Sequence, residues 1–192
     1  MDKLSVTDLM PLEQYARERP GFRARVLQHK ELRKLTVGPN ATWLFEDRLT
    51  VQYQVQEMLR TERIFEPEGI AEELGAYNPL IPDGSNWKVT LLLEYEPTER
   101  PAALARLRGV EHRCFVQVEG SERVFGIADE DLPRENAEKT SAVHFLRFEL
   151  QPPMIAALRA GAALSAGIDH EHYRYALVLS APARAALLAD LS

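Results

Sequence analysis

Two sets of side chains in this sequence have the types and spacing of a chemical site. The first is a row of polar residues, Arg48, Gln52, Gln56 and Arg60, each four positions after the one before. On a helix, residues four apart stack along one side, so these groups would form a continuous polar row. Guanidinium groups bind carboxylates and other anions through paired hydrogen bonds. The row therefore indicates a groove for a small anionic ligand or for a partner protein.

The helix that carries this row is predicted over residues 43–64, with Asn40 or Thr42 as its cap. The row runs between two apolar arcs of that helix, where an unpaired guanidinium or amide would cost several kcal/mol. It must therefore line a cleft or pair internally, and carboxylates such as Glu149 or Asp131 are the candidates for internal pairing. Both readings remain open from the sequence.

A turn-rich segment over residues 76–86 follows the helical region and extends the same candidate site. It contains two prolines and an Asp-Gly turn signal. Tyr77 and Asn78 at its start are predicted to contribute to ligand or partner binding beside the polar row.

The second set consists of His112, Cys114 and His144. His112 and Cys114 are two apart on a predicted strand and so share a face, and His144 begins the apolar face of another strand. If those strands adjoin, the three side chains offer ligands suited to zinc or iron. This favours a metal-dependent enzyme as the alternative function. The competing interpretation places each imidazole at the edge of the core, with Cys114 filling a small apolar space.

Two further charged segments are candidates for weaker sites. Residues 169–172, Asp-His-Glu-His, have metal-binding types but fall in a predicted turn, where polar residues are expected. A predicted helix over residues 22–35 is basic and is a candidate for docking an acidic protein or RNA. Its basic residues are Arg23, Arg25, Lys30, Arg33 and Lys34.

Composition and motifs exclude several classes of function. The sequence has no nucleophile elbow, phosphate-binding loop, dinucleotide fingerprint, Cys-x-x-Cys or His-Glu-x-x-His. This argues against the common hydrolases, kinases, Rossmann enzymes and thiol redox enzymes. The net charge of −6 argues against general nucleic-acid binding. A single cysteine, no signal pattern and no long apolar run predict a cytoplasmic protein without a membrane span.

The pattern of elements predicts an α+β fold in one domain, 1–192, with a helical region over 1–75 and a strand-rich region over 87–192. Pro20 is expected to end a first helix that begins near Pro11. Alternation from Trp87 to Tyr95 indicates a half-buried strand. The other predicted strands are 112–119, 122–127, 143–150 and 173–179, and further helices are predicted over 97–108, 152–164 and after Ser180. We expect an antiparallel-rich sheet of about five strands packed with helices.

Three stretches of the sequence resemble a bacterial family of unknown function. They read FEDRLTVQYQVQEMLR over residues 45–60, YNPLIPDG over 77–84 and EKTSAVHFLRF over 138–148. Genes of similar proteins often lie beside those for rubrerythrin and for flavin- or iron–sulfur-containing oxidoreductases. The resemblance thus implies an accessory protein of a cytosolic redox system, with rubrerythrin or an iron–sulfur oxidoreductase as partner. It supplies no catalytic residues.

Overall fold

The computed structural model describes residues 2–128 and 139–192 as an α+β structure with 43% helix and 27% strand. The described helices are α1 (Leu12–Lys30), α2 (Arg48–Glu62), α3 (Pro67–Tyr77), α4 (Arg100–Arg106), α5 (Pro152–Arg159) and α6 (Ala181–Leu188), with short turns η1 (Val6–Asp8), η2 (Asn78–Leu80) and η3 (Val110–Arg113). The described strands are β1 (Lys34–Val37), β2 (Ala41–Glu46), β3 (Asn86–Leu93), β4 (Cys114–Val118), β5 (Arg123–Phe125), β6 (Ile127–Ala128), β7 (Val143–Glu149), β8 (Leu164–His170) and β9 (Tyr173–Val178). No helix in these two ranges has the length and apolar character that crossing a membrane requires.

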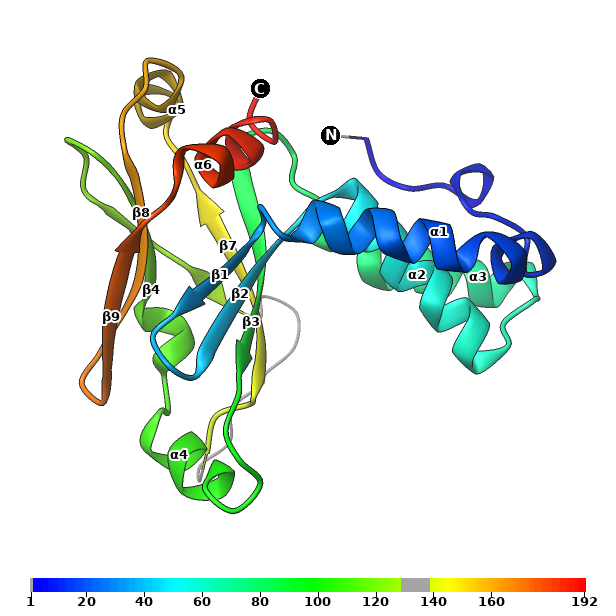
Figure 1. Ribbon diagram of the computed structural model, residues 1–192, viewed down its shortest axis with the longest axis horizontal. Helices are drawn as coiled ribbons and strands as arrows, with labels where there is room; N and C mark the ends of the chain where they lie inside the picture. Colours follow the sequence, from blue (N-terminus) through cyan, green and yellow to red (C-terminus); the bar gives the residue numbers. More distant parts are fainter. Residues whose placement is uncertain (1, 129–138) are drawn as a thin grey trace.

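Two antiparallel sheets pack face to face and form a sandwich (Figure 1). The first sheet has the order β1-β2-β3-β7-β6 and the second has the order β5-β4-β8-β9. The chain passes from the second sheet to the first at Gly126, where a Cβ would lie 3.2 Å from the ring of Phe148. A side chain at this position would therefore press on the ring.

Alternation along the central strands places the core between the two sheets. In β3, Trp87, Val89 and Leu91 are buried while the residues between them are partly exposed, which confirms the predicted strand. The core that both sheets share includes Trp43, Phe45, Trp87, Leu91, Val116, Phe148, Leu164 and Ile168. Helices α5 and α6 lie at one end of the sandwich and α4 lies at the other (Figure 1).

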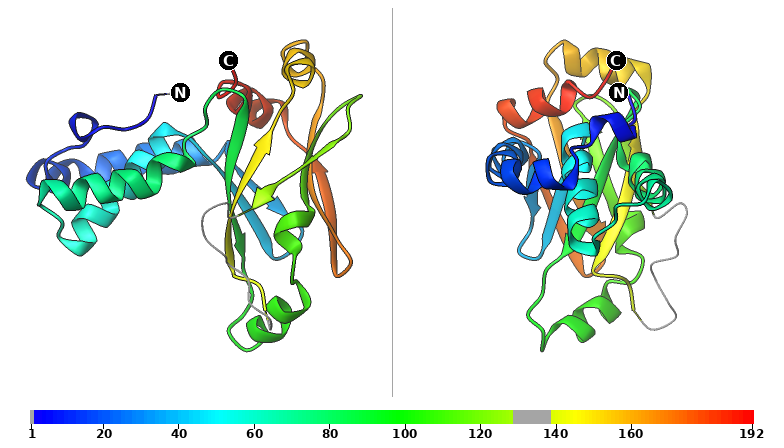
Figure 2. Two further views of the ribbon diagram at one scale, coloured as in Figure 1. Left: turned by 180° about the vertical axis from the view of Figure 1, so that it is seen from behind. Right: turned by 90° about the vertical axis from the view of Figure 1, so that its right-hand side faces the viewer.

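Helices α1, α2 and α3 form an arm that projects from one side of the sandwich (Figure 1, Figure 2). Within the arm, α2 packs against both α1 and α3. Helix α2 begins after Asp47, whose carboxylate accepts a hydrogen bond from the Thr50 main-chain N–H at 2.9 Å. The Thr50 hydroxyl accepts in return from the Asp47 N–H at 2.9 Å, which completes a capping box.

The two helices predicted over residues 22–35 and 43–64 are wrong where they approach each other, because residues 34–35 and 43–46 belong to the hairpin of β1 and β2. Leu44 and Phe45 fit the apolar arcs of a helix wheel, but they lie in the strand β2. The true helix start is Asp47, rather than Asn40 or Thr42. Gly38, with φ +74°, lies in the turn of the hairpin, where a positive φ favours glycine.

Pro20 does not end a helix, and the two helices predicted over residues 11–35 are one helix, α1. Pro20 and Ala16, whose carbonyl loses its helical donor, both lie at the exposed surface of α1. Water can therefore satisfy that carbonyl, so the proline costs less than it would in a buried turn.

The second sheet was not foreseen as a separate layer, mainly because β8 was predicted as the end of a helix and a turn. The strand contains three small residues, Ser165, Ala166 and Gly167, which are weak strand formers. Its pairing with β4 and β9 on either side places it inside the sheet. Of the five predicted strands, β3 and β7 belong to the first sheet, and β4, β5 and β9 belong to the second.

Candidate functional site

The predicted polar row lies on α2 and faces the N-terminal segment of the chain. This segment, residues 2–10, is named here the strap. The strap runs along the arm and turns at its tip into α1 (Figure 1, Figure 2). The spacing of four residues stacks Arg48, Gln52 and Gln56 on one side of α2, as the sequence predicted.

Three residues of the row bind the second half of the strap. A guanidinium nitrogen of Arg48 lies 2.5 Å from the carboxylate of Asp8, and the Gln52 amide donates to the Asp8 carbonyl at 2.6 Å. The Gln56 carboxamide pairs with both main-chain groups of Met10. It accepts from the N–H at 2.6 Å and donates to the carbonyl at 3.3 Å. Gln56 is fully buried, so these bonds satisfy a side chain that would otherwise be costly.

Asn78 holds the first half of the strap in the same way. Its carboxamide accepts from the Leu4 N–H at 2.8 Å and donates to the Leu4 carbonyl at 2.9 Å. The Lys3 ammonium donates to the carbonyls of Asn78 and Ile81 at 3.0 and 2.7 Å. Partial burial of this ammonium lowers the pKa of Lys3. The strap is therefore held by main-chain recognition at both ends.

Leu4 is the apolar anchor of the strap. Its side chain is 5% exposed and belongs to a cluster formed by α2, α3 and the segment after η2. The other buried members of this cluster are Val51, Val55, Leu59, Leu74 and Ile81. Val6, two residues further on, is 54% exposed, whereas Leu9 is partly buried against the same cluster as Leu4.

Asp8 is the strap residue whose carboxylate pairs with Arg48. Its carboxylate accepts hydrogen bonds from the Ser5 N–H and hydroxyl, each at 2.8 Å, and faces Arg48. The Ser5 main-chain bond and the Arg48 guanidinium hold the pKa of Asp8 at about 2. The carboxylate is therefore ionised throughout the physiological range.

The remaining residue of the row, Arg60, does not contact the strap. Its guanidinium lies 3.6 Å from Glu57, which binds mainly Arg19 and the Tyr15 hydroxyl across the arm. The hydrogen bond from Arg19 is the main cause that lowers the pKa of Glu57 to about 2. Arg60 therefore belongs to an ion-pair network between α1 and α2.

The polar row has partners within the chain, and its binding of an outside ligand or partner protein remains a prediction. The partners of Arg48, Gln52 and Gln56 are strap residues, so the row meets a segment of its own chain where the open-cleft reading expected a ligand. Glu149, a predicted internal partner of the row, does not contact it. Its carboxylate binds Ser85, Asn86 and Arg147 on the sandwich. Asp131 lies outside the described residues. Tyr77 makes an apolar contribution, since it is partly buried against the Leu4 cluster.

The chain matches, over residues 3–191, the family described as protein of unknown function (DUF3501). The chain belongs to this family. A similar solved structure is a protein of unknown function from Burkholderia pseudomallei K96243, which is 51% identical, with a TM-score of 0.95 and full coverage of both chains. A comparison with curated proteins finds no match.

In this DUF3501 protein, the second predicted set, His112, Cys114 and His144, does not form a metal centre. No group of three or more metal-ligand side chains occurs among residues 2–128 and 139–192. The side chain of His112 is 64% exposed, whereas His144 is fully buried and lies 2.8 Å from the Thr140 hydroxyl. Cys114 is buried in the core, where its thiol donates to the Val110 carbonyl. Burial raises the pKa of this thiol well above its usual value, so it stays protonated.

The other charged candidates have structural partners. His170 bonds the Arg108 carbonyl and Asp169 pairs with Arg123 and Arg174 at the surface. In the basic segment, Arg33 is buried and binds Asp190, while Arg23 lies exposed on α1.

Sequence reasoning missed the strap residues Lys3, Leu4, Asp8 and Met10. A local signal existed, because Ser5 and Asp8 have the spacing of a capping box and form one around η1. That signal predicts a turn, but it does not indicate that the turn lies against a row of side chains more than forty residues away.

Proposed function

We propose that this protein is a non-enzymatic binding protein whose arm accepts a short segment of a partner protein in the place that its own strap occupies. The observation that carries the proposal is the mode of strap recognition. At each end, one carboxamide, from Asn78 or from Gln56, pairs with both the N–H and the C=O of a single strap residue.

Recognition of this kind is largely independent of sequence, because every non-proline residue offers the same main-chain donor and acceptor. Selectivity comes from two further contacts, the apolar space that holds Leu4 and the guanidinium of Arg48 that faces Asp8. A partner segment that fits should therefore present a leucine followed four residues later by an aspartate. A serine that could form the capping box would strengthen the fit.

The strap competes with any such segment because it is tethered. A short tether gives an effective concentration on the order of millimolar, so a free segment of equal intrinsic affinity cannot displace it at micromolar concentration. A partner must therefore either bind more tightly or engage a second surface at the same time. In this proposal the strap covers its own binding site on α2 and α3, named here the arm groove, until such a partner is present.

The partner is proposed to be a component of a cytosolic redox system, either rubrerythrin or an iron–sulfur oxidoreductase. Support for this part comes from the gene neighbourhood that the family resemblance implies, which is an association and not a contact. A small anionic ligand is a weaker fit, since Asp8 already supplies the carboxylate that Arg48 binds.

The proposal is tested in the full-length chain by loosening the strap with Leu4→Glu and Asp8→Lys together. A labelled peptide with the sequence of residues 2–11 should bind this variant and should bind the unaltered protein at least about tenfold more weakly, measured by fluorescence anisotropy. Adding Asn78→Ala to the loosened chain should reduce peptide binding by a further factor of about ten, because it removes two main-chain hydrogen bonds.

The matched control is Gln14→Ala, which removes an exposed carboxamide of α1 that bonds only Glu18 among the described residues. This control should leave peptide binding unchanged. Helix content by circular dichroism establishes that the arm stays folded in each variant. Failure of the peptide to bind the folded, loosened variant would contradict the groove. Purified rubrerythrin that binds equally well with and without Asn78→Ala would contradict its assignment as the segment donor.

A further inference from the structure

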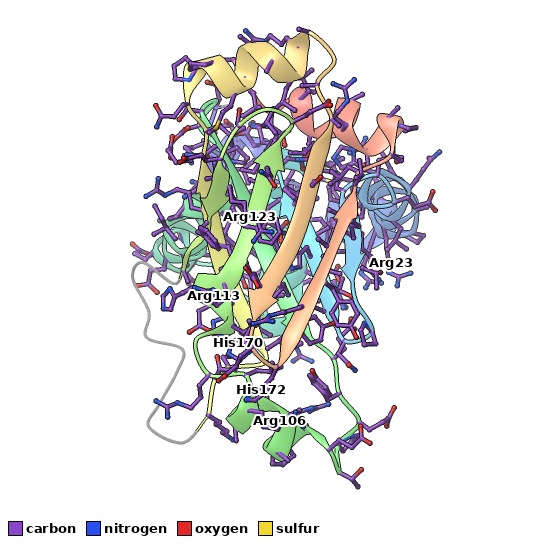
Figure 3. The ribbon with its side chains drawn as sticks, turned by 90° about the vertical axis from the view of Figure 1, so that its left-hand side faces the viewer. Arg23, Arg106, Arg113, Arg123, His170 and His172 are labelled. Carbon is purple, nitrogen blue, oxygen red and sulfur yellow. The ribbon has the colours of Figure 1, made fainter. Side chains whose placement is uncertain are left out.

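The outer face of the second sheet carries a cluster of arginines and phenylalanines. In the part of the chain that is described, no helix lies over this face, and Arg113 and Arg123 stand on it (Figure 3). The cluster is named here the arginine–phenylalanine face, and its residues are Arg113, Phe115, Arg123, Phe125, Asp169 and Arg174. It lies on the side of the sandwich opposite the arm (Figure 1).

Strand register brings the residues of β4, β5, β8 and β9 together, and Arg113 ends the turn η3 directly before β4. Phe115 is opposite Phe125 on one side and Gly167 on the other, and Asp169 is opposite Arg174. Successive residues of a strand alternate between faces, so these side chains point away from the core that Cys114 and Val116 enter.

Aromatic rings fix the orientation of two guanidinium groups. The guanidinium of Arg123 lies 4.0 Å from the centre of the Phe115 ring, and that of Arg113 lies 5.9 Å from the centre of the Phe125 ring. The Phe115 ring itself lies across Gly167, where a Cβ would approach it to 2.7 Å. A guanidinium stacked on a ring turns its N–H edge sideways toward solvent, where it can meet a carboxylate in plane.

The face has a surplus of positive charge and of donors. Among the described residues, the hydrogen bonds and ion pairs of Arg113, Arg123 and Arg174 all go to one residue, Asp169. Arg123 and Arg174 pair with the Asp169 carboxylate, and Arg113 donates to the Asp169 main-chain carbonyl. These four residues together carry a charge of +2 on a chain whose net charge is −6. Each guanidinium has five N–H donors, so further acceptors can be bound without breaking the contacts to Asp169.

We propose that the arginine–phenylalanine face binds an acidic segment of a partner protein, whose carboxylates pair with Arg113, Arg123 and Arg174. Asp169 shows the geometry of such a carboxylate within the chain itself. Arginine and aromatic residues are the types most enriched at the energetic centres of protein interfaces. The exposed Phe125 ring, 42% accessible, supplies the apolar contact that such centres require.

Single-stranded nucleic acid is the weaker occupant for two reasons. Base stacking needs open ring faces, but Phe115 is 3% exposed because Arg123 covers it. The anionic group that the face already holds is also a carboxylate, that of Asp169, rather than a phosphate. This site does not depend on the arm groove, so either surface can fail its test without affecting the other.

The test measures binding of a fluorescein-labelled peptide of about twelve residues, with alternating glutamate and serine, to the full-length protein. A thymidine oligonucleotide of equal charge is the second probe, and both are measured at about 50 and about 300 mM salt. The variant is Arg113→Gln with Arg123→Gln. The matched control is Arg17→Gln with Arg23→Gln, which removes the same charge from exposed positions of α1.

The expected result is that the face variant binds the acidic peptide at least about tenfold more weakly, whereas the control changes binding less than about twofold. Equal losses in the two variants, or no binding of the peptide at about millimolar concentration, would overturn the proposal. Tighter binding of the oligonucleotide that is lost in the same variant would also overturn it. If the double variant does not fold, Arg174→Gln replaces it, because this side chain is 72% exposed. A loss of about threefold is expected there, and an unchanged affinity counts against the proposal.

Discussion

Asp190 is predicted to make the protein more stable at mildly acidic than at alkaline pH. Its carboxylate is buried near the chain end and pairs with the buried guanidinium of Arg33. The same guanidinium lies 3.4 Å from the carboxylate of Asp47, which also contacts His29 at 2.5 Å. Two carboxylates thus share one guanidinium at the junction of arm and sandwich. Burial raises the pKa of Asp190 from 3.8 to about 6, which outweighs the opposing effect of Arg33.

The sign and size of the effect follow from linkage. An acid whose pKa is higher in the folded than in the unfolded state stabilises the fold when it is protonated. This contribution is complete below about pH 3.8 and is lost as the pH rises through about 6. Between about pH 8 and pH 5 the folded state takes up nearly one proton that the unfolded state does not. At one pH unit below the pKa of Asp190 in the folded state, the free energy of unfolding is about 1.4 kcal/mol higher than at alkaline pH. For a chain of this size, that raises Tm by about 3 to 6 °C.

The assay is thermal unfolding followed by circular dichroism at several values between about pH 8 and pH 5. In Asp190→Asn the upward trend in Tm toward pH 5 should vanish, because the titrating group is gone. The control is Asp8→Asn. The pKa of Asp8 is about 2, so that group does not titrate in this window and the trend should persist. A flat or falling Tm in the unaltered protein, or the same trend in Asp190→Asn, would refute the reasoning.

Two further predictions concern the sandwich. Gly167→Ala should lower the free energy of unfolding, measured by urea denaturation, by about 1–3 kcal/mol, because the new Cβ would lie 2.7 Å from the Phe115 ring. The control is Gly75→Ala in α3, where a Cβ would meet no atom within 4 Å, and it should leave stability unchanged or raise it. Cys114 should not react with a thiol reagent at about pH 8 until the protein unfolds, since its thiol is buried and its pKa is raised. Rapid labelling of the folded protein would contradict that account.

The sequence predicted a helix or strand correctly wherever its apolar residues followed a single spacing, that of a helix or that of a strand. The alternation from Trp87 onward predicted β3, and the strands predicted over residues 112–119 and 122–127 contain β4 and β5. The α+β class was likewise predicted correctly. Periodicity works at these positions because one side of each element is buried and the other is in solvent.

Prediction from the local sequence failed where the same apolar residues fitted both the helical and the strand spacing. Leu44 and Phe45 suit both a helix arc and a strand, and only the pairing of β2 with β1 and β3 settles the choice. Residues of low strand propensity in β8 became a central strand for the same reason. Hydrogen bonds to two neighbouring strands outweigh a propensity that spans only about 1 kcal/mol.

The spacing of Arg48, Gln52 and Gln56 was enough to predict that they form one row needing polar partners. It could not identify those partners, because the strap that supplies them reaches the row through the fold of the arm and not through sequence proximity. The arginine–phenylalanine face could not be predicted either, since its residues come from four strands and the turn η3. Residues that share one face of a helix can be recognised from their spacing in the sequence. Contacts between distant segments cannot, because they depend on how the tertiary structure aligns those segments.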